Sequence, residues 1–159
     1  MSGLAAIALG SNLDSRFGDR EANLREAVRR VGELGRVTAV SSFYDTEPVG
    51  LVEQPRFLNG ALLLETNLKP MELMRGLLEV ERAMGRERTA SVAKGPRVID
   101  LDLLLYGDWV LWSDELMLPH PSMAERRFVL GPLAEIAPEW VHPVSGVTVQ
   151  MMLERLGRD

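Results

Sequence analysis

Apolar residues recur along the chain at two different spacings, and their order predicts an α+β fold. Short continuous apolar runs are typical of buried strands, whereas apolar residues three or four positions apart are typical of amphipathic helices. These patterns predict strands over residues 4–9, 37–44, 57–66 and 99–106, and helices over residues 19–34 and 70–84. The order strand, helix, strand, strand, helix, strand is the ferredoxin-like βαββαβ arrangement, in which helices pack on one face of an antiparallel sheet.

Polar residues, glycines and prolines mark the ends of these elements. Asp19 can cap the first helix at its start and Gly35 at its end. Pro70 opens the second helix at a first-turn position, and Gly85 closes it. Residues 45–56 contain prolines and a glycine and are expected to form a long loop. The C-terminal additions to this core are an edge hairpin over 109–118, a short helix that Ser122 starts with a capping box, a turn of helix over 132–136 and a last helix from Thr148 to Leu156.

Length and composition indicate one ordinary globular domain. The chain has 159 residues, of which 46% are hydrophobic and 26% charged, so we expect residues 1–159 to form a single domain. The apolar run over residues 4–9 is too short to span a bilayer, and there is no cysteine for a disulfide, a thiolate metal site or a thiol nucleophile. The net charge of −5 argues against a nucleic-acid binder. We expect a cytoplasmic monomer without a membrane or nucleic-acid partner.

The last strand of the predicted core carries two aspartates. Asp100 and Asp102 interrupt the first half of an apolar run that ends at Gly107. At positions i and i+2 of a strand their side chains leave the same face, with Cα atoms roughly 6.5–7 Å apart. Two such carboxylates repel each other unless a cation lies between them, and oxygen ligands completed by phosphates suit Mg²⁺. The alternative is a frayed, solvated strand end.

A cationic segment leads directly into this strand. From Gly85 to Arg97 the cations are Arg86, Arg88, Lys94 and Arg97, against one acid, Glu87. Guanidinium groups grip phosphate oxygens with paired hydrogen bonds, so the segment and the aspartates together favour a site for polyphosphate and Mg²⁺. The segment lacks apolar anchors, and we expect it to act as a lid that orders when the polyphosphate and Mg²⁺ bind. It contains no P-loop motif; the alternative is a solvated charged loop.

Other candidate residues are less specific when taken singly. Glu81 lies on or beside the apolar stripe of the second helix, where a carboxylate either faces a polar site or snorkels past the edge. His120 lies between prolines and is most often a turn residue, while Asn59 can read the edge of a heterocycle or mark a bulge. Phe57 and Phe128 are more often core residues than ligand platforms.

Several segments occur together in a specific order. They are Gly10-Ser11-Asn12-Leu13, Ser42-Phe43-Tyr44, Gln54-Pro55-Arg56-Phe57-Leu58-Asn59, Gly85-Arg86-Glu87-Arg88, Gly95-Pro96-Arg97-Val98-Ile99-Asp100-Leu101-Asp102, Pro119-His120-Pro121 and Arg126-Arg127-Phe128. They resemble the 6-hydroxymethyl-7,8-dihydropterin pyrophosphokinase family of the folate pathway over nearly the whole chain. The resemblance implies a ferredoxin-like fold and an Mg²⁺-dependent transfer of pyrophosphate from ATP, the co-substrate, to the hydroxymethyl group of a reduced pterin, with release of AMP.

The resemblance also implies a role for each matching residue. Asp100 and Asp102 would hold two Mg²⁺ ions and form the catalytic set with Arg86, Arg88 and Arg97. The residues facing ATP would be Glu81, Arg86, Arg88, Arg97, Leu103, His120 and Arg126, and those holding the pterin would be Thr46, Val49, Phe57, Asn59 and Phe128. Phe57 and Pro121 stand where a tyrosine is common, and Lys94 replaces a loop tryptophan. No general base is assigned, so positioning and metal polarisation would carry the rate.

A non-catalytic ferredoxin-like module is the competing interpretation. An RNA-binding version needs exposed aromatic and basic residues on adjacent strands, but only 6% of the chain is aromatic. A small-molecule regulatory version explains the fold but leaves the cationic segment without a use. ATP binding that requires Mg²⁺, and AMP release that requires the pterin, would separate the enzyme from the module.

Overall fold

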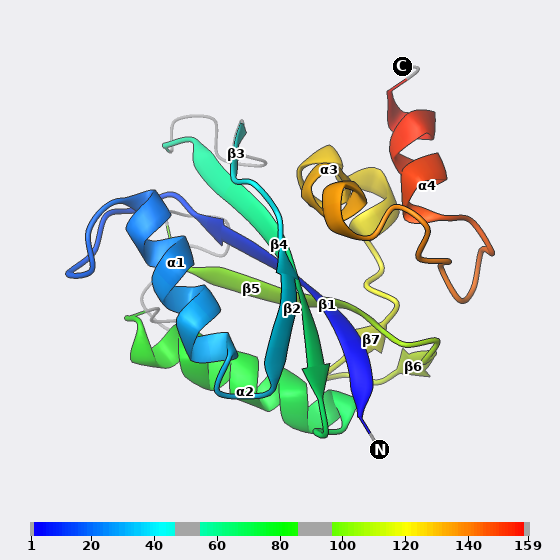
Figure 1. Cartoon of the computed structure of the whole chain (residues 1–159), viewed down its shortest axis with the longest axis horizontal. Coiled ribbons are helices and arrows are strands. Elements are labelled where there is room, and N and C mark those ends of the chain that lie inside the picture. Colours follow the sequence, from blue (N-terminus) through cyan, green and yellow to red (C-terminus); the bar gives the residue numbers. More distant parts are fainter. Residues whose placement is uncertain (1, 47–54, 86–96, 158–159) are drawn as a thin grey trace.

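A twisted antiparallel sheet forms the centre of the molecule (Figure 1). The computed structural model describes residues 2–46, 55–85 and 97–157. Its main sheet has five strands. Four of them lie in the order β2-β4-β1-β5, and the fifth, β3, pairs with β4. The core elements are β1 (Gly3–Ser11), α1 (Arg20–Val31), β2 (Arg36–Val40), β3 (Tyr44–Thr46), β4 (Phe57–Thr66), α2 (Pro70–Ala83) and β5 (Asp100–Tyr106). The predicted α+β class and ferredoxin-like order are confirmed.

The segment after β5 adds a hairpin and two helices. Its elements are β6 (Leu111–Trp112), β7 (Met117–Leu118), a 3₁₀ turn (Met123–Glu125), α3 (Arg127–Ile136) and α4 (Val149–Leu156). The predicted hairpin is present as the β6–β7 pair, and Thr148 caps α4 as predicted by accepting the N–H of Met151 at 3.1 Å. None of the helices in the described part of the chain is long and apolar enough to cross a membrane.

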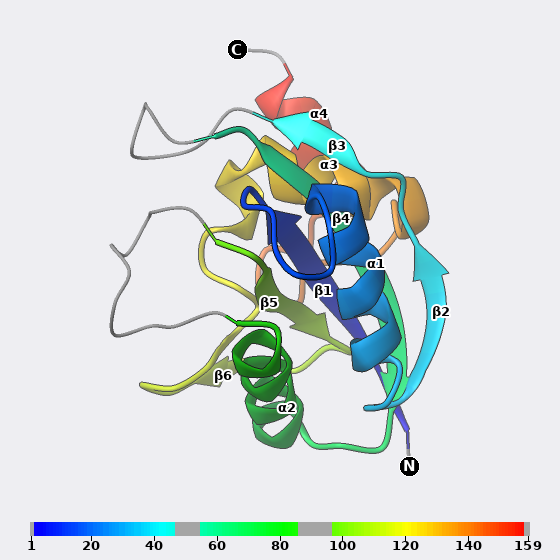
Figure 2. The same ribbon diagram turned by 90° about the vertical axis from the view of Figure 1, so that its left-hand side faces the viewer.

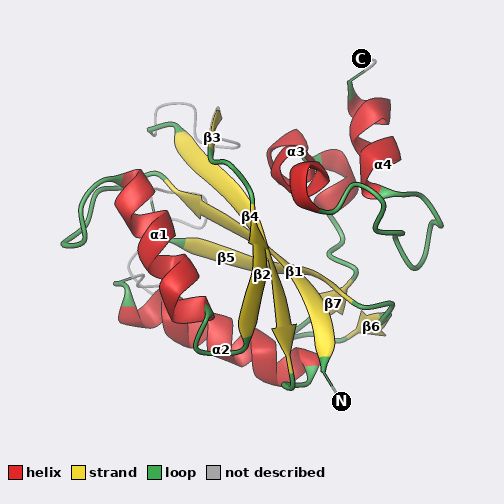
Figure 3. Cartoon of the chain, viewed as in Figure 1, coloured by secondary structure: helices red, strands yellow, loops and turns green. Residues whose placement is uncertain are grey.

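Helices cover both faces of the sheet (Figure 3). α1 and α2 pack on one face, and α3 and α4 pack on the other. Successive side chains of a strand point to opposite faces, so Ile7 of β1 packs into the core under α1 and α2 while Ala6 packs into the core under α3. The C-terminal additions therefore bury the face that the βαββαβ motif alone leaves exposed.

The first helix is shorter than its pattern predicts. α1 follows its N-cap Asp19 but ends at Val31, with Gly32 as its C-cap. The predicted end at Gly35 is wrong. Gly35 instead lies so close to β4 that a Cβ there would be 2.3 Å from the backbone oxygen of Glu65. Glycine at position 35 lets this segment approach β4 closely and does not end the helix.

The strand predicted over residues 37–44 is interrupted after Val40. The hydroxyl of Ser41 accepts the N–H of Ala61 at 2.9 Å, while the N–H of Ser41 donates to the oxygen of Ala61 at 2.9 Å. A side-chain oxygen thus takes the place of a strand carbonyl, and regular pairing resumes at Tyr44. Residues 45–46, predicted as loop, belong to β3, and residues 47–54 lie outside the described residues.

The start of α3 also differs from its prediction. Ser122 makes no side-chain capping bond, so the predicted capping box is wrong, and the segment forms only a single 3₁₀ turn. α3 runs through Pro132, whose missing N–H removes one intrahelical hydrogen bond. Leu130 and Leu133 are fully buried against the sheet. This packing stabilises α3 despite the proline.

A buried amide fixes the turn that follows β1. The side chain of Asn23, on α1, is fully buried and donates to the hydroxyl of Ser11 at 3.1 Å and to the oxygen of Leu13 at 2.8 Å. The hydroxyl of Ser15 donates to the Asn23 side-chain oxygen. These bonds hold the residues on either side of Asn12 against the helix.

Replacing Asn23 by alanine should destabilise the protein. The change leaves buried polar partners unsatisfied, so we expect a loss of about 1–3 kcal/mol in the free energy of unfolding. The exposed Asn67 is the control, and Asn67→Ala should change that free energy by no more than about 0.5 kcal/mol. Urea unfolding followed by circular dichroism measures both, and equal small changes would contradict the structural role of Asn23.

Candidate active site

The two aspartates of β5 share one face of the sheet, as their spacing predicts. Their Cα partners on the neighbouring strand β1 are Gly10, opposite Asp100, and Ala8, opposite Asp102. Because these partners have the smallest side chains, the surface beside the carboxylates stays open. Asp100 and Asp102 are both partly buried and line two adjoining cavities, so they are not a frayed strand end.

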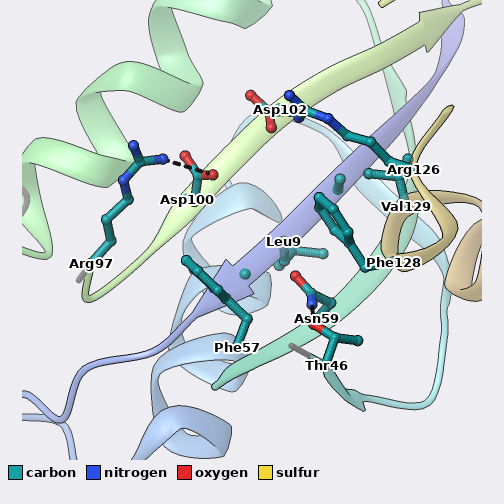
Figure 4. Close-up of a pocket in the computed structure, with 12 residues that line it drawn as sticks. Leu9, Thr46, Phe57, Asn59, Arg97, Asp100, Asp102, Arg126, Phe128 and Val129 are labelled. Carbon is teal, nitrogen blue, oxygen red and sulfur yellow. Dashed lines mark hydrogen bonds and ion pairs between the residues drawn. The ribbon is translucent and has the colours of Figure 1, made fainter. Parts of the chain in front are cut away.

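The first of these, the narrow cavity, has a volume of about 110 Å³ and is flanked by two phenylalanine rings. Figure 4 shows Phe57 of β4 and Phe128 of α3 on either side of it. Thr46 and Asn59 lie at one end, and the side chains at the other end are charged: Arg97, Asp100, Asp102 and Arg126. Both rings line the cavity, and Phe128 also packs against the core under α3, so the expectation of core residues holds only in part. Such a cavity fits a flat, polar-edged molecule.

Asn59 presents a fixed amide to the narrow cavity. Its side chain is 6% exposed and donates to the hydroxyl of Thr46. A Cβ on the facing Gly10 would lie 2.9 Å from the Asn59 side-chain oxygen, so only glycine leaves that oxygen room. β4 is regularly paired on both sides at Asn59, which makes the bulge interpretation wrong.

The second cavity, the wide cleft, has a volume of about 520 Å³ and lies between α2, β5 and the β6–β7 hairpin. Its apolar lining includes Met74, Leu77, Leu78, Leu101, Leu103 and Leu116. Glu81, His120 and Pro121 also line it. Four charged residues of the narrow cavity line this cleft as well: Arg97, Asp100, Asp102 and Arg126. The two cavities therefore meet at the aspartates.

Glu81 is buried rather than snorkelling past the edge of α2. It is 2% exposed, and its carboxylate accepts the N–H of Leu101 at 2.7 Å. Leu101 is the residue between the two aspartates, so Glu81 fixes the part of β5 that carries them. A buried carboxylate needs such partners because desolvation of its charge is costly.

His120 is held in one orientation at the wall of the wide cleft. Its backbone N–H donates to the backbone oxygen of Leu104 at 2.9 Å. Its ring atom Nδ1 accepts the backbone N–H of Ser122 at 3.1 Å. Burial lowers the pKa of His120, the Arg126 guanidinium lowers it further, and Asp100 opposes these two effects. The neutral imidazole therefore carries its proton on Nε2, where it can donate.

Arg97 is fixed through both its side chain and its backbone. Its guanidinium lies 3.3 Å from a carboxylate oxygen of Asp100 (Figure 4). The buried side chain of Asn12 accepts the Arg97 N–H at 2.7 Å and donates to the oxygen of Pro55 at 3.1 Å. The Asn12 N–H also donates to the Arg97 oxygen at 3.0 Å. Sequence reasoning placed Asn12 in a motif but assigned it no such role.

The structure gathers most of the predicted site residues around the two cavities. The narrow cavity is lined by Thr46, Phe57, Asn59, Arg97, Asp100, Asp102, Arg126 and Phe128. The wide cleft adds Glu81, Leu103 and His120. Val49, Arg86, Arg88 and Lys94, and with them the predicted lid, lie outside the described residues. Sequence reasoning assigned no role to Gly10, which lines the narrow cavity, or to Asn12, which holds Arg97.

The donors at the junction fit a cation that phosphate helps to bind. Within the described ranges no group of three or more histidine, cysteine, aspartate or glutamate side chains is arranged to hold a metal ion. Two carboxylates alone leave most of an octahedral shell open, which is how Mg²⁺ is bound when substrate phosphates and waters complete it.

Comparison with known proteins gives one consistent family. Residues 6–138 match the model of the family described as 7,8-dihydro-6-hydroxymethylpterin-pyrophosphokinase (HPPK). A 2-amino-4-hydroxy-6-hydroxymethyldihydropteridine pyrophosphokinase of Bacillus subtilis is 46% identical over 138 residues, which cover 86% of this chain and 79% of the relative. A Synechocystis protein of the same name is 40% identical over 154 residues, covering 96% of this chain and 75% of the relative.

Longer proteins contain a similar region. A folate synthesis bifunctional protein of Arabidopsis thaliana is 47% identical over 131 residues, and the match covers 82% of this chain but only 26% of the relative. The crystal structure of wild-type Plasmodium falciparum HPPK-DHPS with pteroate superposes with a TM-score of 0.75 at 15% identity, covering 98% of this chain and 42% of that one. The superposition shows a shared fold. On the family match and the identities above, the chain belongs to the 7,8-dihydro-6-hydroxymethylpterin-pyrophosphokinase family.

Proposed function

We propose that the two joined cavities are the substrate sites of a pyrophosphokinase, with the pterin in the narrow cavity and ATP in the wide cleft. The observation that carries this proposal is that both cavities share Arg97, Asp100, Asp102 and Arg126. A hydroxymethyl group pointing out of the narrow cavity and a triphosphate entering from the wide cleft would meet at these charges. Such an arrangement brings two reactants together in an oriented pair.

The chain is a pyrophosphokinase of folate synthesis that uses ATP as co-substrate and 6-hydroxymethyl-7,8-dihydropterin as acceptor. The non-catalytic module is therefore not retained. The products, pterin diphosphate and AMP, define the bonds that change. The pterin hydroxyl oxygen bonds to the β-phosphorus of ATP, and the bond from that phosphorus to the oxygen bridging to the α-phosphate breaks. AMP leaves with the bridging oxygen, and the hydroxyl proton is released.

The aspartates are proposed as the metal ligands of this reaction. Asp100 and Asp102 would bind two Mg²⁺ ions together with the phosphates, and the ions would supply charge neutralisation and polarisation of the transferring group. Glu81 would keep the two carboxylates in place through its bond to Leu101. The residues present fit this role because they offer hard oxygen donors on an open face.

The cationic side chains at the junction are proposed to stabilise charge on the transferring group. Arg97 and Arg126 approach from opposite sides of the aspartates (Figure 4). His120 would donate from Nε2 to a phosphate oxygen as a neutral imidazole. Donors held in position before substrate arrives contribute most where charge develops in the transition state. Arg86 and Arg88 are proposed to join this set, on the resemblance of their motif alone.

The narrow cavity is proposed to recognise the pterin by stacking and by its polar edge. Phe57 and Phe128 would contact the two faces of the ring system. The Asn59 side-chain oxygen, directed toward Gly10 rather than Thr46, would accept from an N–H of the pterin. Thr46 would orient the Asn59 amide, whose hydrogen bond its hydroxyl accepts. Val49 is proposed as a pterin-binding residue from the resemblance alone. Phe57 keeps a stacking face but lacks the hydroxyl of the tyrosine common at this position.

We also propose that residues 1–159 act as one domain and as a monomer, without nucleic acid. Support for the monomer is that residues of a single chain line both cavities. The cytoplasmic location stays a prediction from the sequence; two plant relatives, of pea and Arabidopsis, have names that include the word mitochondrial.

Removing either aspartate charge should abolish turnover. In an assay of AMP release, the wild-type enzyme should require both the pterin and Mg²⁺, and Asp100→Asn or Asp102→Asn should lower kcat by about 10²–10³-fold because a metal ligand is lost. Asp108→Asn, at an exposed position after β5, is the matched control and should behave as wild type. Near-normal activity of the two variants at ordinary Mg²⁺ would remove the aspartates from the site.

Truncating either ring should weaken pterin binding selectively. Phe57→Ala and Phe128→Ala each remove one stacking interaction, which contributes about 0.5–1.5 kcal/mol to binding beyond the burial of apolar area. Calorimetry should therefore show a clear loss of pterin affinity and little change in the affinity for MgATP. Phe17→Ala is the control, since Phe17 packs against α1 and the α1–α2 core, away from both cavities. Equal losses for both ligands would mean that the rings are ordinary core residues.

A further inference from the structure

A carboxylate on α3 holds the segment that leads into β3. One oxygen of Glu135 accepts the Ser42 N–H at 2.9 Å and the Ser42 hydroxyl at 3.0 Å, and its other oxygen accepts the Tyr44 hydroxyl at 2.6 Å. Three donors from one segment thus converge on a single carboxylate. Figure 2 shows β3 passing beside α3 at this point. We call this set of contacts, made by Ser42, Tyr44 and Glu135, the α3–β3 clamp.

The two elements joined by the clamp are the ones that carry opposite walls of the narrow cavity. Phe128 lies about two helical turns before Glu135, so both residues lie on the same side of α3. Thr46 is two positions after Tyr44 and therefore lies on the same face of β3. Tyr44 and Thr46 pair with Asn59 and Phe57 of β4. The clamp consequently links the wall made by Phe128 to the wall made by β3 and β4.

The three residues of the clamp are exposed to solvent, and their protonation states favour its hydrogen bonds. The hydrogen bond from Tyr44, followed by those from Ser42, lowers the pKa of the Glu135 carboxyl. The same Glu135 bond raises the pKa of Tyr44, with smaller contributions from burial. The carboxylate therefore stays charged and the phenol stays protonated near neutral pH, and hydrogen bonds to a charged acceptor are shorter and stronger than neutral ones.

We propose that Glu135 is a positioning residue that sets the width of the narrow cavity. This inference rests on the proposed function, in which the pterin occupies that cavity. Without the clamp, Leu130 and Leu133 still hold α3 on the sheet, but the direct tie between α3 and β3 is lost, and the position of the Phe128 ring relative to Thr46 and Phe57 becomes less well fixed. The wide cleft adjoins α3 at Arg126, the N-cap of that helix, and its other lining residues lie outside α3 and β3, so we expect the clamp to affect nucleotide binding much less than pterin binding.

The test is steady-state kinetics of four variants with both substrates. Glu135→Ala should raise the KM for the pterin about tenfold, while the KM for ATP and the melting temperature stay near the wild-type values. Tyr44→Phe removes one bond and keeps the ring, so it should raise the pterin KM about threefold. The double variant should have the same pterin KM as Glu135→Ala alone, because the partner of the Tyr44 hydroxyl is already absent there. Glu154→Ala, at an exposed position on α4, is the control and should leave both KM values unchanged.

Two results would overturn the inference. One is a wild-type pterin KM in Glu135→Ala and Tyr44→Phe; the other is an equal rise in both KM values together with a lower melting temperature, which marks a purely structural role. Phe128→Ala separates the inference from the proposed function. Loss of pterin affinity in Phe128→Ala with wild-type behaviour in Glu135→Ala overturns the inference alone, whereas wild-type behaviour in both overturns the placement of the pterin as well.

Discussion

Asp100 and Asp102 place two negative charges on one face of a strand that is otherwise buried, and the site is organised around that repulsion. Arg97 pairs with Asp100, Arg126 approaches from the other side, and the strand itself is held by the bond from Leu101 to the buried Glu81. Carboxylates held in this way suit the proposed binding of cations that arrive with a polyphosphate. The electrostatic constraint on β5 therefore links the fold to the metal-dependent phosphoryl chemistry proposed for the site.

The rest of the molecule makes room beside this charged strand and keeps its walls in place. Gly10 and Ala8 on β1 leave the space opposite the aspartates open, and α3 closes that space with Phe128. The helices of the βαββαβ core cover the other face, where α2 forms the apolar side of the wide cleft. The C-terminal additions are thus part of the site as well as part of the core, because they supply Arg126, Phe128 and His120.

What the sequence could predict depended on how local each signal is. The strand and helix order and the shared face of Asp100 and Asp102 follow from residue spacing within one element, and the structure confirms them. The end of α1 and the break after Val40 could not be predicted, since they arise from a close approach at Gly35 and from a hydroxyl of Ser41 that enters the sheet. Asn12 contacts Pro55 and Arg97 across separations of 43 and 85 residues, and Glu135 contacts Ser42 across 93. Spacing along the chain cannot predict such pairs. The family resemblance proposed which residues face ligands but did not indicate which residues support them.

A crystal structure of the enzyme with the pterin, Mg²⁺ and a non-hydrolysable ATP analogue would test the placement of both substrates most directly. The pterin should lie between the rings of Phe57 and Phe128, the triphosphate in the wide cleft, and metal ions between the phosphates and the carboxylates of Asp100 and Asp102. The hydroxymethyl oxygen should face the β-phosphorus at the junction of the two cavities. A pterin bound outside the narrow cavity, or metal ions that do not touch either aspartate, would contradict this arrangement.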